Sequence, residues 1–292
     1  MIPGCPNFHC DFHHKKDHVV RDGSYFRKED SRKIARFKCK SCRKKFSFST
    51  FKLEYKQKKR RINHKLFMLL ASGISMRRAA RFLNVHQTTV HRKVIYLAKK
   101  SRKEHGDFLA ELRKDPVVSF QFDDLISSVH TKLKPVSISI AVDAKRRFIL
   151  GAEVGSIPAF GHLAELSRRK YGKRKNEHEE KLAKLLADIS PSVSAIAKIE
   201  SDEHHSYAPL VFKFFPYAEY VQYKGEKSCV AGLGELKKVH YDPLFKINHT
   251  CAMFRANVNR LFRRTWCTSK KTEMLKNHLD IFIHYHNKYL LS

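Results

Sequence analysis

The chain has 292 residues, of which 42% are hydrophobic, so it can bury a sizeable core and wholesale disorder is excluded. A run of about 18 apolar residues, the length that a membrane span needs, does not occur in the sequence. The net charge of +31 comes from 59 Lys and Arg against 28 Asp and Glu, and it predicts a polyanionic partner.

The positive charge is concentrated in the N-terminal part of the chain. Residues 1–114 hold 31 basic and 9 acidic side chains, a net +22, whereas residues 115–292 hold 28 and 19, a net +9. This asymmetry favours nucleic-acid binding by the N-terminal part. The start, "MIPGCPNFHC", lacks the basic and apolar stretches of a secretory signal, and seven cysteines suit a reducing compartment. We therefore expect a cytoplasmic protein without a membrane partner.

Four cysteines near the N-terminus form two close pairs, Cys5 and Cys10 in "CPNFHC" and Cys39 and Cys42 in "CKSC". Four thiolates on two short turns can surround Zn²⁺ tetrahedrally. Between the pairs, "HVVRDG" and "RKIARFKC" predict short strands. Residues 1–52 therefore predict a zinc ribbon whose folding depends on a structural Zn²⁺.

Other assignments of these cysteines are possible. Because C-x₄-C is looser than C-x₂-C, three histidines are alternatives to Cys10: His9, His13 and His14. Four unrelated buried thiols are the remaining interpretation. Three further cysteines have no partner at ligand spacing and are expected to be buried thiols: Cys229, Cys251 and Cys267.

A basic linker, "KQKKRR" (56–61), leads into residues 60–104, which have the apolar spacing of three helices. Gly73 ends the first helix, Ser75 is in position to cap the second, and "NV" makes the turn before a third helix that begins near Gln87. This pattern predicts a helix-turn-helix, with a plain helical linker as the alternative. Four polar side chains of the third helix are expected to reach base edges in the major groove: Gln87, Thr88, His91 and Arg92.

After residue 115 the composition changes toward β-branched and aromatic residues, which predicts an α/β domain over residues 115–292. Short loops join the first three predicted strands, so an antiparallel meander is expected. The predicted elements are strands at 117–122, 136–142 and 148–154, helices at 161–170 and 176–188, and a strand at 194–201.

Acidic side chains follow two of these predicted strands. Asp123 falls at the end of the first strand and Asp202 at the end of the fourth. Carboxylates at strand ends can converge on one edge of a sheet, and their oxygens suit Mg²⁺, which assists phosphoryl transfer. The acidic stretch "ESDE" (200–203) in a basic chain therefore predicts a metal site that faces a DNA phosphate. Asp124 and Glu203 are the neighbouring alternatives.

A zinc ribbon, a helix-turn-helix and then strands bearing "FDD" and "ESDE" resemble the transposases of small bacterial insertion sequences. The tail "INHTCAMFRANVNRLFRRTWCTSKKTEMLKNHLDIFIHYHN" (247–287) is similar to the final catalytic helix of that family and the helix after it. The resemblance covers nearly the whole chain. It implies an RNase H-like catalytic domain, a mixed sheet flanked by helices, with a DDE site that binds Mg²⁺ or Mn²⁺.

Carried over by position, the first catalytic aspartate of the family falls on Asp123 and the second on Asp202. The third ligand, normally Glu, falls on Asn248. A basic residue that follows the third ligand by about two helical turns falls on Arg255, on nearly the same helix face, where it can contact DNA beside the metals.

The resemblance implies a nucleoid-associated bacterial transposase that binds the terminal inverted repeats of its element, cleaves DNA strands and transfers them. Its partners would be the double-stranded DNA of the element ends and target, and at least one second copy of the chain, because two ends must be brought together. Asn248 in place of Glu leaves an alternative, a catalytically inactive DNA-binding protein or regulator derived from a transposase. A recombinase that links covalently to DNA is a third interpretation.

Overall fold

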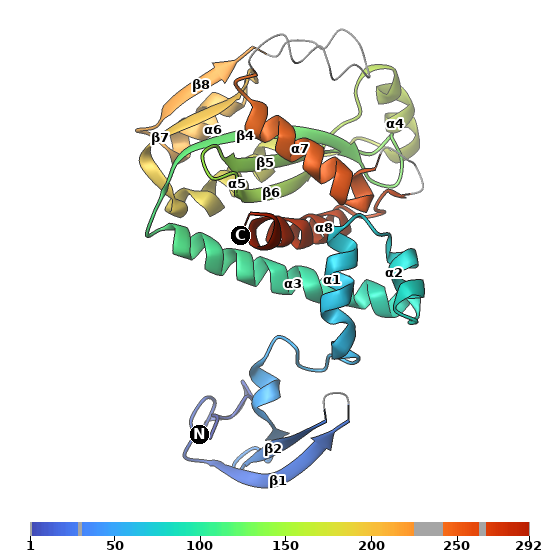
Figure 1. The fold of residues 1–292 in the computed structure, drawn as a ribbon, viewed down its shortest axis with the longest axis vertical. Coiled ribbons are helices and arrows are strands. Elements are labelled where there is room, and N and C mark those ends of the chain that lie inside the picture. Colours follow the sequence, from blue (N-terminus) through green and yellow to red (C-terminus); the bar gives the residue numbers. More distant parts are fainter. Residues whose placement is uncertain (1, 29–30, 225–241, 263–266, 292) are drawn as a thin grey trace. The chain divides into compact units, whose positions relative to one another are not determined.

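The computed structural model describes residues 2–28, 31–224, 242–262 and 267–291. The chain forms two compact units, Met1–Lys65 and Leu66–Ser292 (Figure 1). The predicted ribbon segment lies in the first unit, and the segment with the predicted sheet lies in the second. Across the described ranges, none of the helices combines the length and apolar character that crossing a membrane requires.

The first unit is built on a small antiparallel sheet of three strands, β1 (Val19–Arg27), β2 (Arg32–Cys39) and β3 (Lys45–Phe46). Two short 3₁₀ turns follow, η1 (Phe48–Phe51) and η2 (Arg60–Ile62). The two strands predicted between the cysteine pairs are thus confirmed as β1 and β2. In the described part of this unit, the apolar cluster around the cysteines has three other buried side chains: Val19, Phe37 and Phe46. So small a core provides little stability of its own.

Three helices follow, α1 (Asn63–Ala71), α2 (Met76–Phe82) and α3 (Gln87–Leu112). Gly73 has φ +75°, which stops α1 where the sequence predicts. The Ser75 hydroxyl accepts a hydrogen bond from the backbone N–H of the third residue after it and so caps α2. The helix starts therefore agree with the sequence. In contrast, α3 continues well beyond residue 104.

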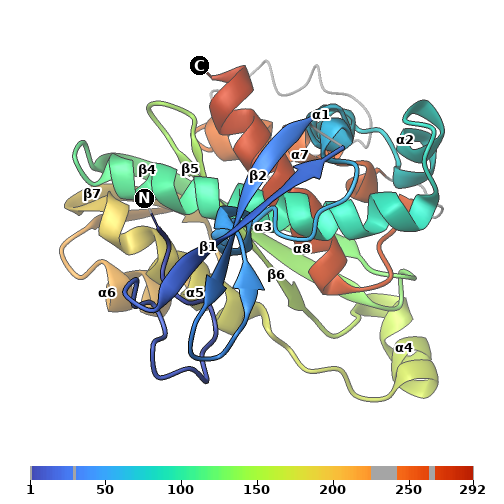
Figure 2. The same ribbon diagram turned by 90° about the horizontal axis from the view of Figure 1, so that it is seen from below.

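Helix α3 packs against α8 (Thr272–Tyr285), which crosses it in the view of Figure 2. Arg102 donates a hydrogen bond to Asn277 Oδ1 at 3.0 Å and forms an ion pair with the buried Asp280. The three helices therefore belong to the same compact unit as the sheet from residue 66 onward. The division predicted between residues 60–104 and 115–292 does not coincide with a boundary between units.

The second unit contains a mixed five-stranded sheet in the order β6-β5-β4-β7-β8. Strands β4, β5 and β6 pair antiparallel, whereas β7 is parallel to β4 and β8 is parallel to β7. The antiparallel meander predicted for the first three strands is confirmed. The strand bounds are Val117–Ser128 for β4, Pro135–Asp143 for β5, Ile149–Ser156 for β6, Val193–Asp202 for β7 and Glu219–Tyr223 for β8.

Helices cover both faces of this sheet (Figure 1). One face packs against α7 (Phe245–Asn257) and α8, and the opposite face packs against α5 (His178–Ile189) and α6 (Tyr207–Phe214). The helix predicted at 161–170 begins with a 3₁₀ turn and continues as α4 (Ala164–Tyr171). The expected α/β architecture, a mixed sheet flanked by helices, is confirmed. Strand β8 and helix α6 were not predicted from the sequence.

The two aspartates at the predicted end of the first strand lie in the middle of β4. This strand continues to Ser128, which pairs with Pro135 across a hairpin, because β5 provides antiparallel partners throughout. Pairing of β4 with β7 extends only as far as Gln121 opposite Glu200. Asp123 and Asp124 therefore lie where β7 leaves β4, and the prediction that the strand itself ends there is wrong.

Candidate functional sites: a cysteine cluster and a carboxylate pair

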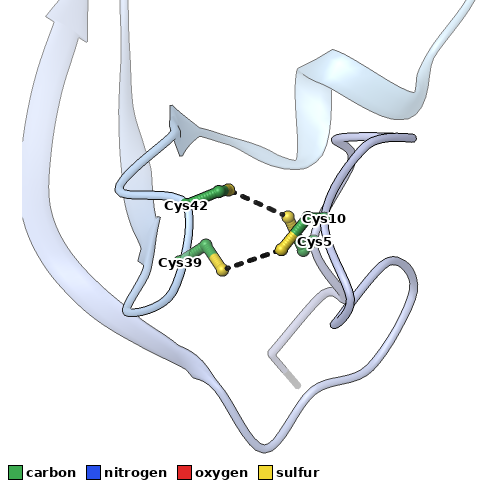
Figure 3. Close-up of side chains that lie close together, drawn as sticks. All are labelled: Cys5, Cys10, Cys39 and Cys42. Atoms are coloured by element: carbon green, nitrogen blue, oxygen red, sulfur yellow. Dashed lines mark hydrogen bonds between the residues drawn. The ribbon is translucent and has the colours of Figure 1, made fainter.

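The four N-terminal cysteines meet at one point of the first unit, with their side chains directed toward one another (Figure 3). The Sγ atoms of Cys5 and Cys42 are 3.6 Å apart, and those of Cys10 and Cys39 are 3.9 Å apart. All four sulfurs lie within 4.8 Å of one another. Among the described residues, clusters of three or more His, Cys, Asp or Glu side chains close enough to share a metal ion are limited to these four cysteines. It can bind a structural metal such as zinc.

The protein around the cluster shifts the pKa values of two of the thiols in opposite directions. A hydrogen bond from the backbone N–H of Lys44 lowers the pKa of Cys42 to about 6, whereas burial raises the pKa of Cys5 to about 12. One thiolate is thus available near neutral pH, and forming the others in this buried site is costly. A divalent cation offsets that cost, so the donor set fits a metal ion.

The second site begins with the alternation of β4, which directs Asp123 and Asp124 to opposite faces of the sheet. The Asp124 carboxylate accepts four side-chain hydrogen bonds on the face covered by α5 and α6. Its donors are Ser137 at 2.7 Å, Ser139 at 2.6 Å, Tyr207 at 2.6 Å and His178. Burial alone would raise the pKa of Asp124, but the hydrogen bond from His178 and the other donors lower it. With both oxygens satisfied inside the protein, Asp124 is poorly suited to be the alternative metal ligand.

Asp123 has a different environment on the face covered by α7. Burial raises its pKa to about 7, and the nearby negative charge of Asp202 adds to this increase. The register explains the proximity: Gln121 is opposite Glu200, and Asp123 and Asp202 each follow their strand's member of that pair by two residues. Side chains at such positions of parallel strands lie on the same face.

Asp202 completes this carboxylate pair. Burial raises its pKa, and the negative charge of Asp124 adds to this increase. Its Oδ1 atom is buried without a hydrogen-bond partner among the described residues. Two partly buried carboxylates that repel each other, one with an unsatisfied oxygen, fit a divalent cation because its charge removes both costs. Glu203, the other alternative ligand, is exposed and lies beyond the end of β7.

A residue that sequence reasoning missed, Gln121, fixes helix α7 above this junction of strands. Its Nε2 donates to Glu200 Oε2 at 2.9 Å and to the Pro243 carbonyl at 2.7 Å. Its Oε1 accepts from the Ile247 backbone N–H at 3.1 Å. A buried Gln between Phe120 and Phe122 is the only signal that the sequence offers for this role, and its partners are remote in the chain.

The two predicted site residues of α7, Arg255 and Asn248, have different interaction partners. Arg255 is exposed, and its charge acts on Asp123 and lowers the pKa of that carboxyl against the effect of burial. Asn248 Nδ2 donates to Asp242 Oδ2 at 2.9 Å, and within the described ranges no hydrogen bond joins Asn248 to Asp123 or Asp202. The structure therefore brings together Asp123, Asp202 and Arg255. It leaves Asn248 on the same helix, bonded elsewhere.

The predicted base-reading residues lie in the first turns of α3. Gln87, Thr88 and Arg92 are exposed. His91 is half-buried, its Nδ1 is buried without a hydrogen-bond partner among the described residues, and its charge acts on the buried His278 of α8. Three of the four side chains therefore face solvent, whereas His91 faces α8.

No model of a known protein family matches the chain, and no curated protein matches its sequence. The fold, the cysteine cluster and the carboxylate pair are therefore the observations from which a function is argued.

Proposed function

We propose that the chain is a DDE-type transposase, which binds the terminal inverted repeats of an insertion sequence and catalyses metal-dependent DNA cleavage and strand transfer. The observation that carries this proposal is the juxtaposition of Asp123 and Asp202, which come from strands β4 and β7 and are far apart in the chain. The mixed sheet, with three antiparallel strands, two parallel ones and helices on both faces, is consistent with an RNase H-like domain.

In the proposed reaction, water attacks a phosphodiester at the element end and releases a 3′-hydroxyl, which then attacks a phosphodiester of the target. Bound Mg²⁺ or Mn²⁺ would stabilise charge on the attacking and leaving oxygens. Asp123 and Asp202 would hold the cation, and the raised pKa of Asp123 means that cation binding displaces a proton near pH 7. Arg255, beside Asp123, would contact a DNA phosphate.

The basic N-terminal part supplies the proposed DNA recognition. The four-cysteine unit would be a zinc ribbon, and α1, α2 and α3 would form a helix-turn-helix in which Gln87, Thr88 and Arg92 contact bases. The charge of +22 in residues 1–114 supports binding to the DNA backbone. Joining two element ends requires at least a dimer.

One observation favours a second candidate, a DNA-binding protein or regulator without catalytic activity. The position that resembles the third carboxylate ligand is Asn248, and its amide is bonded to Asp242. An amide oxygen has no formal charge, so it would hold a second cation more weakly than Glu.

A strand-cleavage assay on the terminal repeats of the element tests the proposal against this candidate. We expect nicking that requires Mg²⁺ or Mn²⁺ and is lost in Asp123→Asn and Asp202→Asn, with end binding retained in both variants. Specific binding without nicking by the wild type in either metal would favour the regulator. A covalent protein–DNA product on denaturing gels would reject both in favour of a recombinase.

A further inference from the structure

A pocket of about 540 Å³ lies beyond Asp123 along β4, within the second unit. Its lining comes from four places: the β4–β5 hairpin, residues 159–163 after β6, the end of α7 with the turn that follows it, and Thr268. Its volume is in the range of sites that hold a small organic molecule. It is distinct from the carboxylate pair, because neither Asp123 nor Asp202 contributes to its lining.

One wall of the pocket carries a cation that is held in place by the protein. Arg260 Nε donates to His278 Nε2 at 3.4 Å, and its NH1 donates to the Cys267 carbonyl at 3.1 Å. Burial and the charge of Arg260 lower the pKa of His278 to about 3, so this imidazole is neutral and can accept. Within the described ranges Arg260 forms no ion pair with a carboxylate. A largely desolvated cation without an anion is costly, so the pocket wall is suited to an anionic ligand.

Further residues of the lining define the rest of the ligand. Arg255 lines the pocket and acts electrostatically on Asp123, so it lies between the pocket and the carboxylate pair. Apolar side chains form another part of the wall, and among them Phe160 is 65% exposed. Cations next to an accessible aromatic ring match a phosphate joined to a flat base, which is the chemistry of a nucleotide.

We propose that this pocket holds one unstacked nucleotide of a DNA strand, with its phosphate between Arg255 and Arg260 and its base against Phe160. That the ligand is DNA, rather than another polyanion, rests on the proposed function. The pocket adds to that function a separate binding site for the nucleotide that neighbours the cleaved bond. A base in this pocket would be withdrawn from the duplex, so the pocket would select DNA that is single-stranded or opened at that position.

Photo-cross-linking tests this directly. A short oligonucleotide carrying one 5-iodouracil is bound to the full chain as a single strand and as a fully paired duplex, irradiated, and the modified peptide is identified by mass spectrometry. We expect the single strand to cross-link at Phe160 or at Phe262, which also lines the pocket. Phe160→Ala should weaken binding of the single strand about tenfold, since stacking of a base on an aromatic ring contributes about that much. Arg255→Gln should also weaken it.

Phe212→Ala is the matched control, because Phe212 is also an exposed phenylalanine (51%) but lies in α6 on the other face of the sheet. Cross-links outside the pocket, or equal affinities for Phe160→Ala and Phe212→Ala, would overturn the proposal. Thymidine monophosphate that binds as tightly as the oligonucleotide would indicate a free-nucleotide site and would also overturn it. Cross-linking requires neither cleavage nor metal, so an inert chain that cross-links at Phe160 would refute only the transposase activity. A chain that cleaves without cross-linking there would refute only the pocket.

Discussion

Asp202 lies beside Asp123 on one face of the sheet, and its negative charge adds to the effect of burial in raising the pKa of Asp123 to about 7. The two side chains come from parallel strands that separate at this point, β4 and β7. Because the interior destabilises each charge and each charge destabilises the other, the folded protein is expected to depend on pH and on divalent cations in a predictable direction.

The first prediction concerns this pH dependence. The pKa of Asp123 is about 7 in the folded state, above its ordinary value of 3.8. Between these two pH values the folded chain therefore binds more protons than the unfolded chain. The contribution of Asp123 to stability therefore falls as pH rises from about 4 and is fully lost above about pH 7. Thermal unfolding should show Asp123→Asn gaining stability relative to the wild type between about pH 5 and pH 8. At the upper pH, Mg²⁺ should raise the melting temperature of the wild type but not of the variant.

Asp107→Asn is the control for this measurement, since Asp107 is an exposed carboxylate on α3. It should unfold with the pH dependence of the wild type. If Asp123→Asn does so too, the carboxylate pair is not strained in the folded protein.

The second prediction separates the two neighbouring aspartates. Asp124→Asn replaces an acceptor of four hydrogen bonds by an amide, which leaves the Ser139, Tyr207 and His178 donors poorly matched. Breaking such a buried pair costs about 3 kcal/mol. Urea unfolding at neutral pH should therefore show a large loss of stability for Asp124→Asn and none for Asp123→Asn. Similar unfolding midpoints for both variants would contradict the assignment of opposite faces.

The contrast between these aspartates also shows how far the sequence could predict the site. Adjacent positions in a strand point to opposite faces, but whether each face offers hydrogen-bond donors depends on elements remote in the chain. The donors to Asp124 lie on β5, α5 and α6, and no local pattern in "FDD" indicates them. The sequence predicted the proximity of Asp123 and Asp202 by placing both at strand ends, but Asp123 lies within β4. The two residues come together because Gln121 is opposite Glu200 in the parallel pairing of β4 and β7, a register that the sequence alone does not give.

The fold was predictable where periodicity is strong and was missed where it is weak. Strands β4, β5 and β6 are rich in β-branched and aromatic residues and were located closely. Strand β8, "EYVQY", is short and nowhere fully buried, and α6, "YAPLVFKF", has a Pro and apolar residues on all sides. Charged residues are rare in strands, so the Asp pair suggested that β4 ends there. Tertiary pairing with β5 outweighs that local preference.

The third prediction concerns the cysteine cluster. We expect one Zn²⁺ per chain, and we expect a chelator to unfold residues 1–52. The reason is that the apolar cluster around the cysteines is small, with three other buried side chains among the described residues. Cys39→Ser should lose the metal and become sensitive to protease in this segment. Cys267→Ser, a half-buried cysteine outside the cluster, should keep both the metal and the resistance. Elemental analysis that finds no zinc in protein purified without chelator would refute the site.

The fourth prediction concerns DNA recognition by α3. Gln87→Ala and Arg92→Ala should reduce discrimination between terminal-repeat and random DNA, by about 1–3 kcal/mol for each lost base contact. Arg61→Ala in the linker should instead weaken binding to both DNAs and reduce its dependence on salt. His91→Ala should act through stability rather than discrimination, since His91 faces α8. Equal losses on both DNAs for Gln87→Ala and Arg92→Ala, measured by titration at several salt concentrations, would count against a recognition helix.

The fifth prediction concerns Asn248, whose hydrogen bond to Asp242 gives its variants distinct outcomes. Asp242 Oδ1 also accepts from the Leu244 backbone N–H at 2.9 Å, so the turn before α7 keeps this bond when Asn248 is changed. If the Asn248 amide oxygen binds cation, Asn248→Ala should abolish nicking while end binding and stability are largely retained. Asn248→Asp should keep some nicking but place a second negative charge beside Asp242, so its stability should fall unless Mg²⁺ is present.

Two other patterns would assign Asn248 differently, and nicking per folded molecule, measured with melting temperature, distinguishes them. If Asn248 only stabilises the start of α7, Asn248→Ala should melt earlier and nick as the wild type does. If it is a ligand lost from an ancestral site, the wild type should be inert in both metals, and Asn248→Glu should restore nicking. Asn257→Ala is the control, because Asn257 lies at the other end of the same helix and its Nδ2 bonds only to the Met253 carbonyl within the described ranges. We expect the Asn248 amide oxygen to bind the cation. The reason is that Asn248 is on the face of α7 that carries Cys251 and Arg255, both of which interact electrostatically with Asp123.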